Sequence, residues 1–381
     1  MFAERFLSRL MLQQQAGLYR EPPEVKIRDG KYLSIEGRRV LNFASNDYLG
    51  LGVSKELRQR AARNFEKYGT SSSSSRLVSG NYAIINEAEK EYASYFGYGD
   101  AIFFPSGYQA NLGILSTILE PGDTVIFDKH IHASSVKGMS MSGARFLGYN
   151  HNSMSHLGRR LEVCGGQQVA VLTESLFSMD GDLLDVNGLE KLKERCRFLT
   201  IVDEAHAFGV IGSGGRGIAC PVADIAVGTF GKALGLFGAF VLLPFGFKEY
   251  LLNFSSPLIY TTTLPEAHAA TAIDILEIVE RSEDRRNHLR DVSQFLKEGL
   301  RLGGFRVTGN AHILALEIGD EAKAANMARK LLQKNIFVLP ARYPTVPLHR
   351  SILRISITAL HDEDDVKTFI NCVKEASGEL K

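Results

Sequence analysis

The sequence predicts an α/β protein: a mainly parallel wound sheet with helices on both sides, followed by a smaller α+β domain. Between about residues 100 and 245, short apolar runs alternate with longer polar or amphipathic stretches. The runs are bounded by Gly, Asp and Pro, as is typical of strands buried on both faces of a parallel sheet. After about residue 265 the pattern changes to a long helical stretch, and then to strand-like segments around one helix.

The first pattern predicts seven strands with helices between them. The stretches from Tyr108 to Leu119 and from Val186 to Arg197 are expected to be helices, which gives the βαβ order of a wound sheet. The apolar runs expected to form strands are AIFF (101–104), TVIF (124–127), ARFL (144–147), VAVLT (169–173), FLTIV (198–202), DIAVG (224–228) and AFVLL (239–243).

The rest of the chain supplies a first helix and a second domain. The opening MFAERFLSRLMLQQQ predicts an amphipathic helix and lacks the continuous apolar stretch of a secretory signal. One long helix is expected from Glu266 to Leu302, since no Pro and no Gly interrupts it before Gly299. Another, from Glu321 to Lys334, is expected among the strand segments FRVTG, HILALEIG, NIFVLP and ILRISIT. We therefore expect an N-terminal segment (1–45), a large α/β domain (46–284) and a small α+β domain (285–381).

Composition argues against several classes of protein. The 44 Lys and Arg residues against 43 Asp and Glu give a formal charge of +1, so nothing indicates a nucleic-acid partner or an anionic membrane. The most apolar later stretch, 237–247, is shorter than the ~20 residues that span a bilayer. Four dispersed cysteines without a CxxC pair argue against a disulfide framework or a zinc knuckle, so we expect no metal and a reducing cytoplasm.

A single lysine stands out in the segment DIAVGTFGKALGLFGAF. Lys232 follows a strand-like run and lies among four glycines. A carbonyl cofactor needs such an amine, held near it by a backbone that lets the lysine leave and return. The alternative is a surface lysine in a glycine loop. A phosphate-binding P-loop is excluded, because position 226 is Ala226 and the lysine is followed by Ala233.

An acidic residue and a histidine follow the run FLTIV. Asp203 stands at the expected carboxyl end of this strand, where ligands of open α/β sheets collect, and His206 comes three residues later. A carboxylate beside a pyridine nitrogen keeps it protonated and makes the ring an electron sink. The alternatives are a helix cap for Asp203 and a core histidine for His206. Together with Lys232, the cofactor interpretation is favoured.

Further candidates follow other strands. Gly107 and Tyr108 open a helix whose amides and dipole suit a phosphate, and the hydroxyl of Thr229 is placed to add to that site. His132 is placed to stack on a cofactor ring, and Ser178 follows a strand end. Each of these has a loop or cap residue as its alternative. Another glycine pattern, Gly212, Gly214 and Gly217, predicts a mobile loop rather than a dinucleotide site, because no buried strand leads into it.

Taken together, these segments resemble the α-oxoamine synthases, a family of pyridoxal 5'-phosphate enzymes. The resemblance implies a fold-type I transferase, a homodimer with active sites at the subunit interface, and decarboxylating condensation of an amino acid with an acyl thioester. The segments that carry it are NFASNDYLGL (42–51), SRLVSGN (75–81), FPSGYQAN (104–111), HAS (132–134), FSMDGD (177–182), DEAH (203–206), TFGK (229–232) and IYTTTLP (259–265).

The resemblance also implies a role for each matching residue. Lys232 would be the Schiff-base lysine, Asp203 the partner of the pyridinium and His132 the stacking histidine. Arg354 would hold the amino acid carboxylate, which suits a bidentate guanidinium. The remaining matches are Ser178, His206 and Thr229 as cofactor ligands, Gly107 and Tyr108 on the phosphate side, Thr262 (among Thr261 to Thr263) at the partner subunit's phosphate, and Arg20 and Thr345 at the substrate.

Within the family, SRLVSGN and Arg342 match best the biotin-pathway member that joins L-alanine to a pimeloyl thioester carried by coenzyme A or acyl carrier protein. The alternatives are the family members 2-amino-3-oxobutyrate ligase, 5-aminolaevulinate synthase and serine palmitoyltransferase and, outside them, an aminotransferase or a non-catalytic partner subunit. The sequence departs from the pattern of the biotin-pathway member at two places. Tyr343 stands where that member usually has Pro, and YPTVP also resembles the glycine-using 5-aminolaevulinate synthases. The run GTSSSSSR (69–76) is poorer in Gly than in the family.

Overall fold

The computed structural model describes residues 2–164 and 168–378, and the chain divides into two compact units. The large unit comprises Leu49–Ser178 and Leu183–Arg286. The small unit comprises Met1–Tyr48, Met179–Asp182 and Asn287–Lys381. The N-terminal residues therefore belong with the C-terminal ones, to which they are joined by strand pairing.

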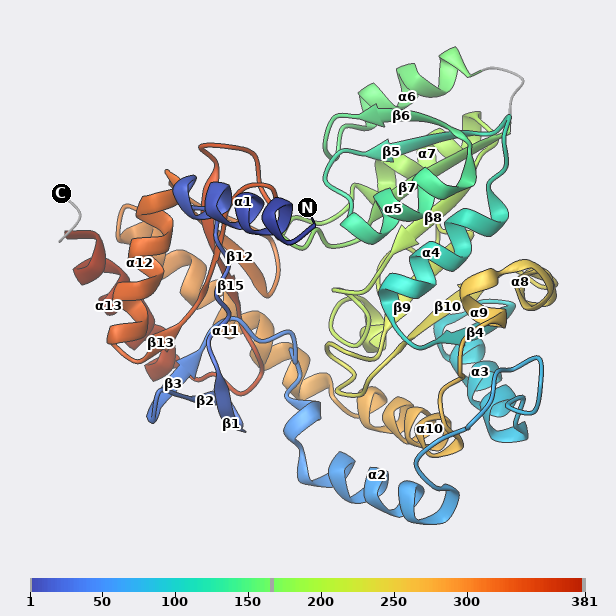
Figure 1. The fold of residues 1–381 in the computed structure, drawn as a ribbon, viewed down its shortest axis with the longest axis horizontal. Coiled ribbons are helices and arrows are strands. Elements are labelled where there is room, and N and C mark those ends of the chain that lie inside the picture. The colour runs from blue at the N-terminus through green and yellow to red at the C-terminus, as the bar shows by residue number, and fades with distance from the viewer. Residues whose placement is uncertain (1, 165–167, 379–381) are drawn as a thin grey trace. The chain divides into compact units, whose positions relative to one another are not determined.

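A seven-stranded sheet forms the centre of the large unit (Figure 1). Its order is β4-β10-β9-β8-β7-β5-β6, and every neighbouring pair is parallel except the two that involve β10. This confirms the expected mainly parallel sheet. The strands are β4 (Asp100–Phe104), β5 (Thr124–Asp128), β6 (Arg145–Tyr149), β7 (Val169–Glu174), β8 (Leu199–Asp203), β9 (Ile225–Thr229) and β10 (Ala239–Leu243).

Both faces of this sheet are covered, which explains why its strands are continuously apolar. Within β5, Val125 packs into one core cluster and its neighbour Ile126 into the other. Helices α4 (Gly107–Ile118) and α5 (Ala133–Ser142) cover the first face and lie side by side in Figure 1. Helices α6 (Met154–Val163) and α7 (Val186–Arg195) contribute to the second cluster. Each fully buried aliphatic side chain here stabilises the fold by about 1.5–3 kcal/mol.

The long helix expected from Glu266 to Leu302 is in fact two helices, so that prediction was wrong. Helix α10 (Glu266–Glu280) ends before Ser282, and α11 (Glu283–Leu302) begins after it. The Ser282 hydroxyl donates a 2.6 Å hydrogen bond to the carbonyl of Ile278, and the Ser282 carbonyl accepts the amide of Arg286 at 3.0 Å. Serine competes for backbone groups in this way, so it can end a helix without Pro or Gly.

The small unit contains two four-stranded sheets. One joins β1, β2 and β3 to β13, with β13 parallel to β3, and the other is the antiparallel sheet β11-β12-β15-β14. The expected C-terminal strand segments and α12 are present; β1 to β3 and α13 were not anticipated. The bounds are α1 (Phe2–Gln15), β1 (Val25–Asp29), β2 (Tyr32–Ile35), β3 (Arg38–Asn42), β11 (Val307–Thr308), β12 (Ile313–Gly319), α12 (Glu321–Gln333), β13 (Ile336–Phe337), β14 (Leu339–Ala341), β15 (Ser351–Ser356) and α13 (Glu363–Gly378).

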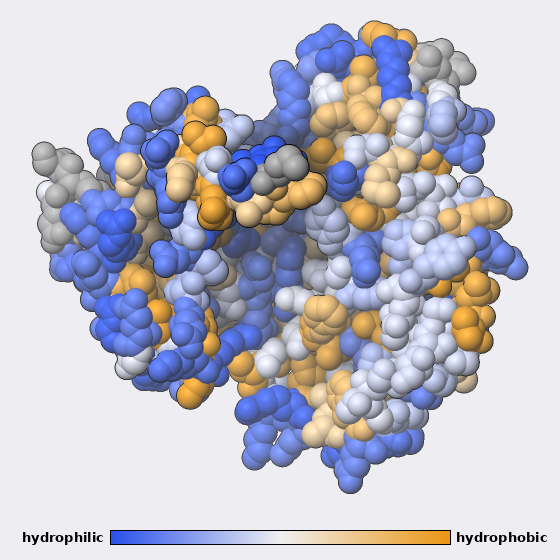
Figure 2. Space-filling view, in the orientation of Figure 1, coloured by the Kyte–Doolittle hydropathy of each residue, from blue (hydrophilic) through white to orange (hydrophobic). Residues whose placement is uncertain are grey.

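Apolar and hydrophilic side chains alternate over the surface seen in Figure 2. Helix α1, which was expected to be amphipathic, leaves large apolar side chains such as Phe2 and Leu12 exposed. Within residues 2–164 and 168–378, no helix combines the length and the apolar character that crossing a membrane requires.

Candidate functional site

A cavity of about 210 Å³ opens in the large unit at the carboxyl ends of β7, β8 and β9. The register of the strands explains why the cavity lies there, because Asp203 pairs with Glu174 of β7 on one side and with Val227 of β9 on the other. Seven residues singled out in the sequence line this cavity. The complete lining is Gly107, Tyr108, Asn111, His132, Ser134, Glu174, Asp203, Ala205, His206, Val227, Gly228, Thr229 and Lys232.

Lys232 lies in the turn that joins β9 to the antiparallel β10. Its Nζ atom is 2.7 Å from Nε2 of His206, which follows β8. The turn is closed by a hydrogen bond from the Phe230 amide to the Gly238 carbonyl. Gly235, at φ 69°, leaves no room for a side chain, since a Cβ there would lie 2.4 Å from the amide nitrogen of Gly52. The glycines thus allow the backbone to bring the amine into the cavity.

The carboxylate of Asp203 is buried and held by two donors. One oxygen accepts the amide of Ala205 and the other accepts Nδ2 of Asn111, each at 2.9 Å. Asn111 lies in α4, so this helix both covers the sheet and fixes the aspartate. A buried carboxylate facing the same cavity as an amine suits the pairing with a protonated ring nitrogen.

His132 caps α5, and its own amide donates a 2.6 Å hydrogen bond to Glu174. Burial lowers the pKa of His132, and the charge of Lys232 lowers it further while Asp203 opposes the change. Burial also raises the pKa of Glu174 well above its ordinary range, with Asp203 adding to the effect. The cavity therefore favours a neutral imidazole at His132 and a protonated Glu174.

The amino end of α4 forms the other wall. The helix begins at Gly107, capped by the hydroxyl of Ser106, which accepts the amide of Gln109 at 3.2 Å. A Cβ on Gly107 would meet nothing within 4 Å, so there is space before the free amides of this twelve-residue helix. Thr229 lines the same cavity at the end of β9. Its hydroxyl donates to the Gly238 carbonyl at 3.0 Å and accepts the Gly231 amide.

This donor set fits pyridoxal phosphate. It offers an amine for the aldehyde, a buried carboxylate for the ring nitrogen and a helix terminus for the phosphate.

Five other predicted site residues are not among those lining the cavity in the described part of the chain. Ser178 and exposed Thr262 belong to the large unit, where the neighbouring Thr263 amide bonds to the carbonyl of Ser74. The other three, Arg20, Thr345 and Arg354, belong to the small unit.

In the small unit, Arg354 is buried on β15. Its guanidinium donates to the hydroxyl of Ser356 at 2.6 Å and to Oδ1 of Asn46 at 3.4 Å. The family segment NFASNDYLGL and the strand segment ILRISIT thus meet at this arginine. Arg342 donates to the carbonyl of Gly17 at 2.6 Å, which joins the chain just before Arg20 to the turn that contains Thr345.

Three residues with polar side chains line the cavity but were not singled out from the sequence: Asn111, Ser134 and Glu174. Glu174 carried a usable signal, because it directly follows the run VAVLT at a strand end. Asn111 and Ser134 lie within the motifs FPSGYQAN and HAS but inside helices, where a polar residue ordinarily indicates a solvated or capping position.

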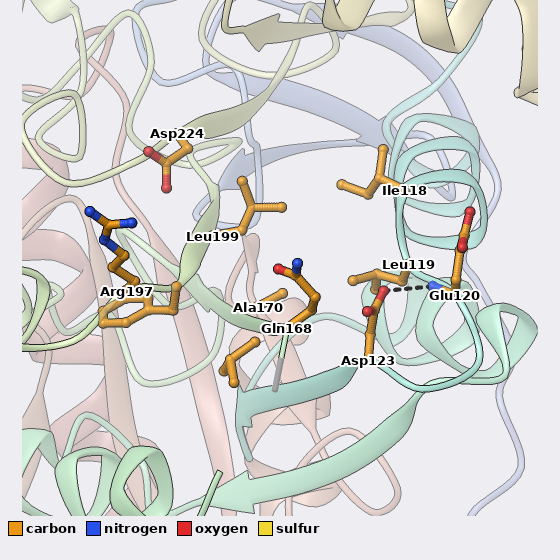
Figure 3. A pocket seen from close by; sticks show the side chains of 11 residues that line it. Ile118, Leu119, Glu120, Asp123, Gln168, Ala170, Arg197, Leu199 and Asp224 are labelled. Atoms are coloured by element: carbon orange, nitrogen blue, oxygen red, sulfur yellow. Dashed lines mark hydrogen bonds between the residues drawn. The ribbon is translucent and has the colours of Figure 1, made fainter. Parts of the chain in front are cut away.

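A larger cavity of about 590 Å³ lies at the opposite, amino-terminal ends of β5, β7, β8 and β9 (Figure 3). Two of its three acidic side chains have hydrogen-bond partners: Asp123 accepts the amide of Glu120 at 2.9 Å, and Asp224 accepts Nζ of Lys193 at 2.8 Å. None of the predicted site residues is among the described residues that line it. Ligands of wound sheets bind at the carboxyl ends of strands, so the smaller cavity is the candidate site.

Known proteins resemble this chain over most of its length. Residues 38–373 match the family model for aminotransferase class I and II. The 8-amino-7-oxononanoate synthase of Trichlorobacter lovleyi is 38% identical over 98% of this chain and 97% of its own. Serine palmitoyltransferase from S. paucimobilis, solved with bound PLP-myriocin aldimine, superposes with a TM-score of 0.92 at 27% identity, covering 98% of this chain and 97% of that one. The 8-amino-7-oxononanoate synthase of Francisella tularensis gives a TM-score of 0.79 at 30% identity, covering 90% and 98%.

These matches extend over nearly the whole chain and include the sheet that holds Lys232 and Asp203. The chain therefore belongs to the α-oxoamine synthase family of fold-type I, pyridoxal phosphate-dependent transferases.

Proposed function

We propose that this chain catalyses the decarboxylative condensation of L-alanine with a pimeloyl thioester, the reaction of 8-amino-7-oxononanoate synthases in biotin biosynthesis. The observation that carries the reaction type is the amine of Lys232 beside His206, in one cavity with the buried carboxylate of Asp203. The relatives support the substrates, since chains of that name match at 36% and 38% identity over nearly their full length.

When bound, pyridoxal phosphate supplies an electron sink for the carbanion that forms at the amino acid's α-carbon. The protein supplies the proton chemistry. Lys232 would bind the cofactor aldehyde through Nζ, and its free amine would take the α-proton of the amino acid. Asp203 would hold a proton on the ring nitrogen. The α-carbon would then bond to the carbonyl carbon of the thioester as the thiol carrier leaves, carbon dioxide would be lost, and Lys232 would return the proton to the α-carbon of the amino ketone.

The other residues would bind and orient. The amides at the start of α4 hold the phosphate, as helix amino termini do. His132 covers the ring, and Arg354 pairs with the carboxylate of alanine through its planar guanidinium. Arg20 and Thr345 are assigned to the acyl substrate on the family resemblance, and Ser178 to the cofactor.

The functional form we propose is a homodimer, with Thr262 reaching the phosphate of the partner's cofactor. The large unit supports this by its exposed apolar side chains at Leu77, Val78, Phe237 and Tyr260, which are 69%, 80%, 68% and 81% exposed. Such side chains are characteristic of interaction surfaces. We propose a reducing compartment, consistent with four unpaired cysteines. A molar mass by light scattering of twice the chain mass would support the dimer. An active protein with the mass of one chain would contradict it.

The test of the substrates is an amino acid titration of the cofactor-loaded protein, followed by absorbance and by product analysis with pimeloyl donors. We expect L-alanine alone to change the cofactor spectrum, and pimeloyl-coenzyme A or pimeloyl acyl carrier protein then to yield 8-amino-7-oxononanoate. A response to glycine or serine with inert pimeloyl donors would move the chain to another family member. Conversion of the cofactor to its pyridoxamine form by a keto acid cycle would instead indicate an aminotransferase.

A further inference from the structure

A chain of hydrogen bonds joins Asp203 to His132 through Asn111 and Ser134; it is buried at Asn111 and partly buried at His132. Nδ2 of Asn111 lies 2.9 Å from Oδ2 of Asp203 and 3.0 Å from Oγ of Ser134. Asn111 and Ser134 are only 2% and 1% exposed. An amide nitrogen can only donate, so both of its hydrogens are used. The flipped amide would place the carbonyl of Asn111 against a carboxylate, which fixes its orientation.

The direction of the next bond follows. Because the hydroxyl of Ser134 accepts from Asn111, its own hydrogen is available to the ring of His132, whose Nδ1 lies 2.7 Å away. The backbone amide of Ser134 also donates to this Nδ1, at 3.3 Å. A backbone amide can only donate a hydrogen bond. Nδ1 of His132 therefore accepts from two donors and carries no proton.

We propose that Asn111 and Ser134 are positioning residues that hold His132 as a neutral imidazole with its single proton on Nε2. In this form His132 presents a hydrogen-bond donor, and not a base, to the molecule that it covers. The same amide of Asn111 donates to the carboxyl group of Asp203. One set of hydrogen bonds thus joins the two groups that are assigned to the cofactor ring, and in this respect the inference rests on the proposed function.

The surroundings agree with this assignment. The charged or titratable groups that share the cavity with His132 are Tyr108, Glu174, Asp203, His206 and Lys232. Burial and the charge of Lys232 lower the pKa of His132, whereas Asp203 raises it. Protonation of Nδ1 would place its new hydrogen against the Ser134 amide and hydroxyl hydrogens. These two hydrogen bonds therefore lower the pKa of His132, as burial does.

The experiment is a pH titration of the full-length, ¹⁵N-histidine-labelled protein by long-range ¹H–¹⁵N correlation spectra, with His132 assigned by its loss in His132→Gln. We expect the nitrogen shifts of an Nε2–H tautomer. In Ser134→Ala and Asn111→Ala the titration midpoint of His132 should rise by roughly half a unit to one unit, the effect of losing one bond that opposes protonation. Ser134→Thr keeps a hydroxyl and should restore the original midpoint.

Ser135→Ala is the matched control. Its hydroxyl is buried on the same helix and has no hydrogen-bond partner among the described residues, so the midpoint should not move. An Nδ1–H pattern in the unaltered protein, or equal midpoints in Ser134→Ala and Ser135→Ala, would overturn the proposal. Neither readout needs cofactor or substrate, so inert pimeloyl donors would leave this inference standing.

Discussion

The amine of Lys232 and Nε2 of His206 lie 2.7 Å apart although 26 positions separate them in the sequence. The reason is that β8 and β9 are parallel neighbours, so the chain leaves both strands at the same edge of the sheet. One of the two nitrogens must donate to the other, which keeps the amine directed at the cavity before cofactor binds.

Replacing this amine should abolish the reaction. In Lys232→Ala we expect turnover to fall by at least about 10³-fold, because proton transfer alone contributes roughly 10²–10⁴-fold and the covalent link to the cofactor is lost as well. Borohydride reduction followed by peptide mass analysis should find pyridoxyl-lysine at residue 232 in the unaltered protein. Lys137→Ala, exposed on α5, is the control. Undiminished turnover in Lys232→Ala would refute the assignment.

Removing the charge of Asp203 should slow catalysis without unfolding the protein. Asp203→Asn keeps the shape, but it no longer stabilises a proton on the ring nitrogen, and we expect kcat to fall roughly 10²-fold or more. Steady-state kinetics at saturating cofactor measures this. Asp123→Asn removes an equal charge from the cavity at the amino-terminal ends of the strands, and its kcat should stay near that of the unaltered protein. Equal rates for the two variants would argue against the proposed pairing.

Glu204 should make stability depend on pH. Its carboxylate accepts the amides of Ile218 and Ala219 at 3.1 and 2.7 Å, yet full burial raises its pKa to about 7. The folded state thus binds the proton of Glu204 more tightly than the unfolded state does. The free energy of unfolding that this proton contributes is lost as pH rises from about 4.5 to 7. Relative to the unaltered protein, Glu204→Gln should gain up to about 3 kcal/mol of unfolding free energy between pH 4.5 and 8.

Urea unfolding at several pH values tests this, with Glu190→Gln on the exposed face of α7 as the control. If the difference in unfolding free energy between Glu204→Gln and the unaltered protein stays constant with pH, Glu204 is ionised throughout this range.

The buried ion pair of Arg76 and Glu89 should be structural. Oε1 of Glu89 lies 2.6 Å from Arg76 and also accepts the Phe103 amide, while Lys248 reaches its Oε2 at 2.7 Å. Glu89→Ala would leave a buried guanidinium unpaired, and we expect a loss of about 3–5 kcal/mol in unfolding free energy. The double variant Arg76→Met/Glu89→Leu should lose less. Chemical denaturation compares them, and a larger loss in the double variant would contradict this account.

Local sequence was enough for the strands and for the expectation that Lys232 and Asp203 stand at the edge of the sheet where ligands bind. Strands buried on both faces are continuously apolar, and a residue directly after such a run lies at the sheet edge where ligands bind. Neither rule depends on knowing which strands are neighbours. The break at Ser282 was missed because it depends on one hydroxyl bonding to its own helix, which periodicity does not report.

What the sequence determined, then, was the α/β class, the family and the residues that stand at strand ends, because these follow from apolar runs and from short motifs. The tertiary structure decided which of those residues share a cavity, and it alone placed Asn111, Ser134 and Glu174 among them. Hydrogen bonds between a helix and the ends of separate strands depend on sheet order, register and side-chain direction, and these are set by the packing of the whole unit.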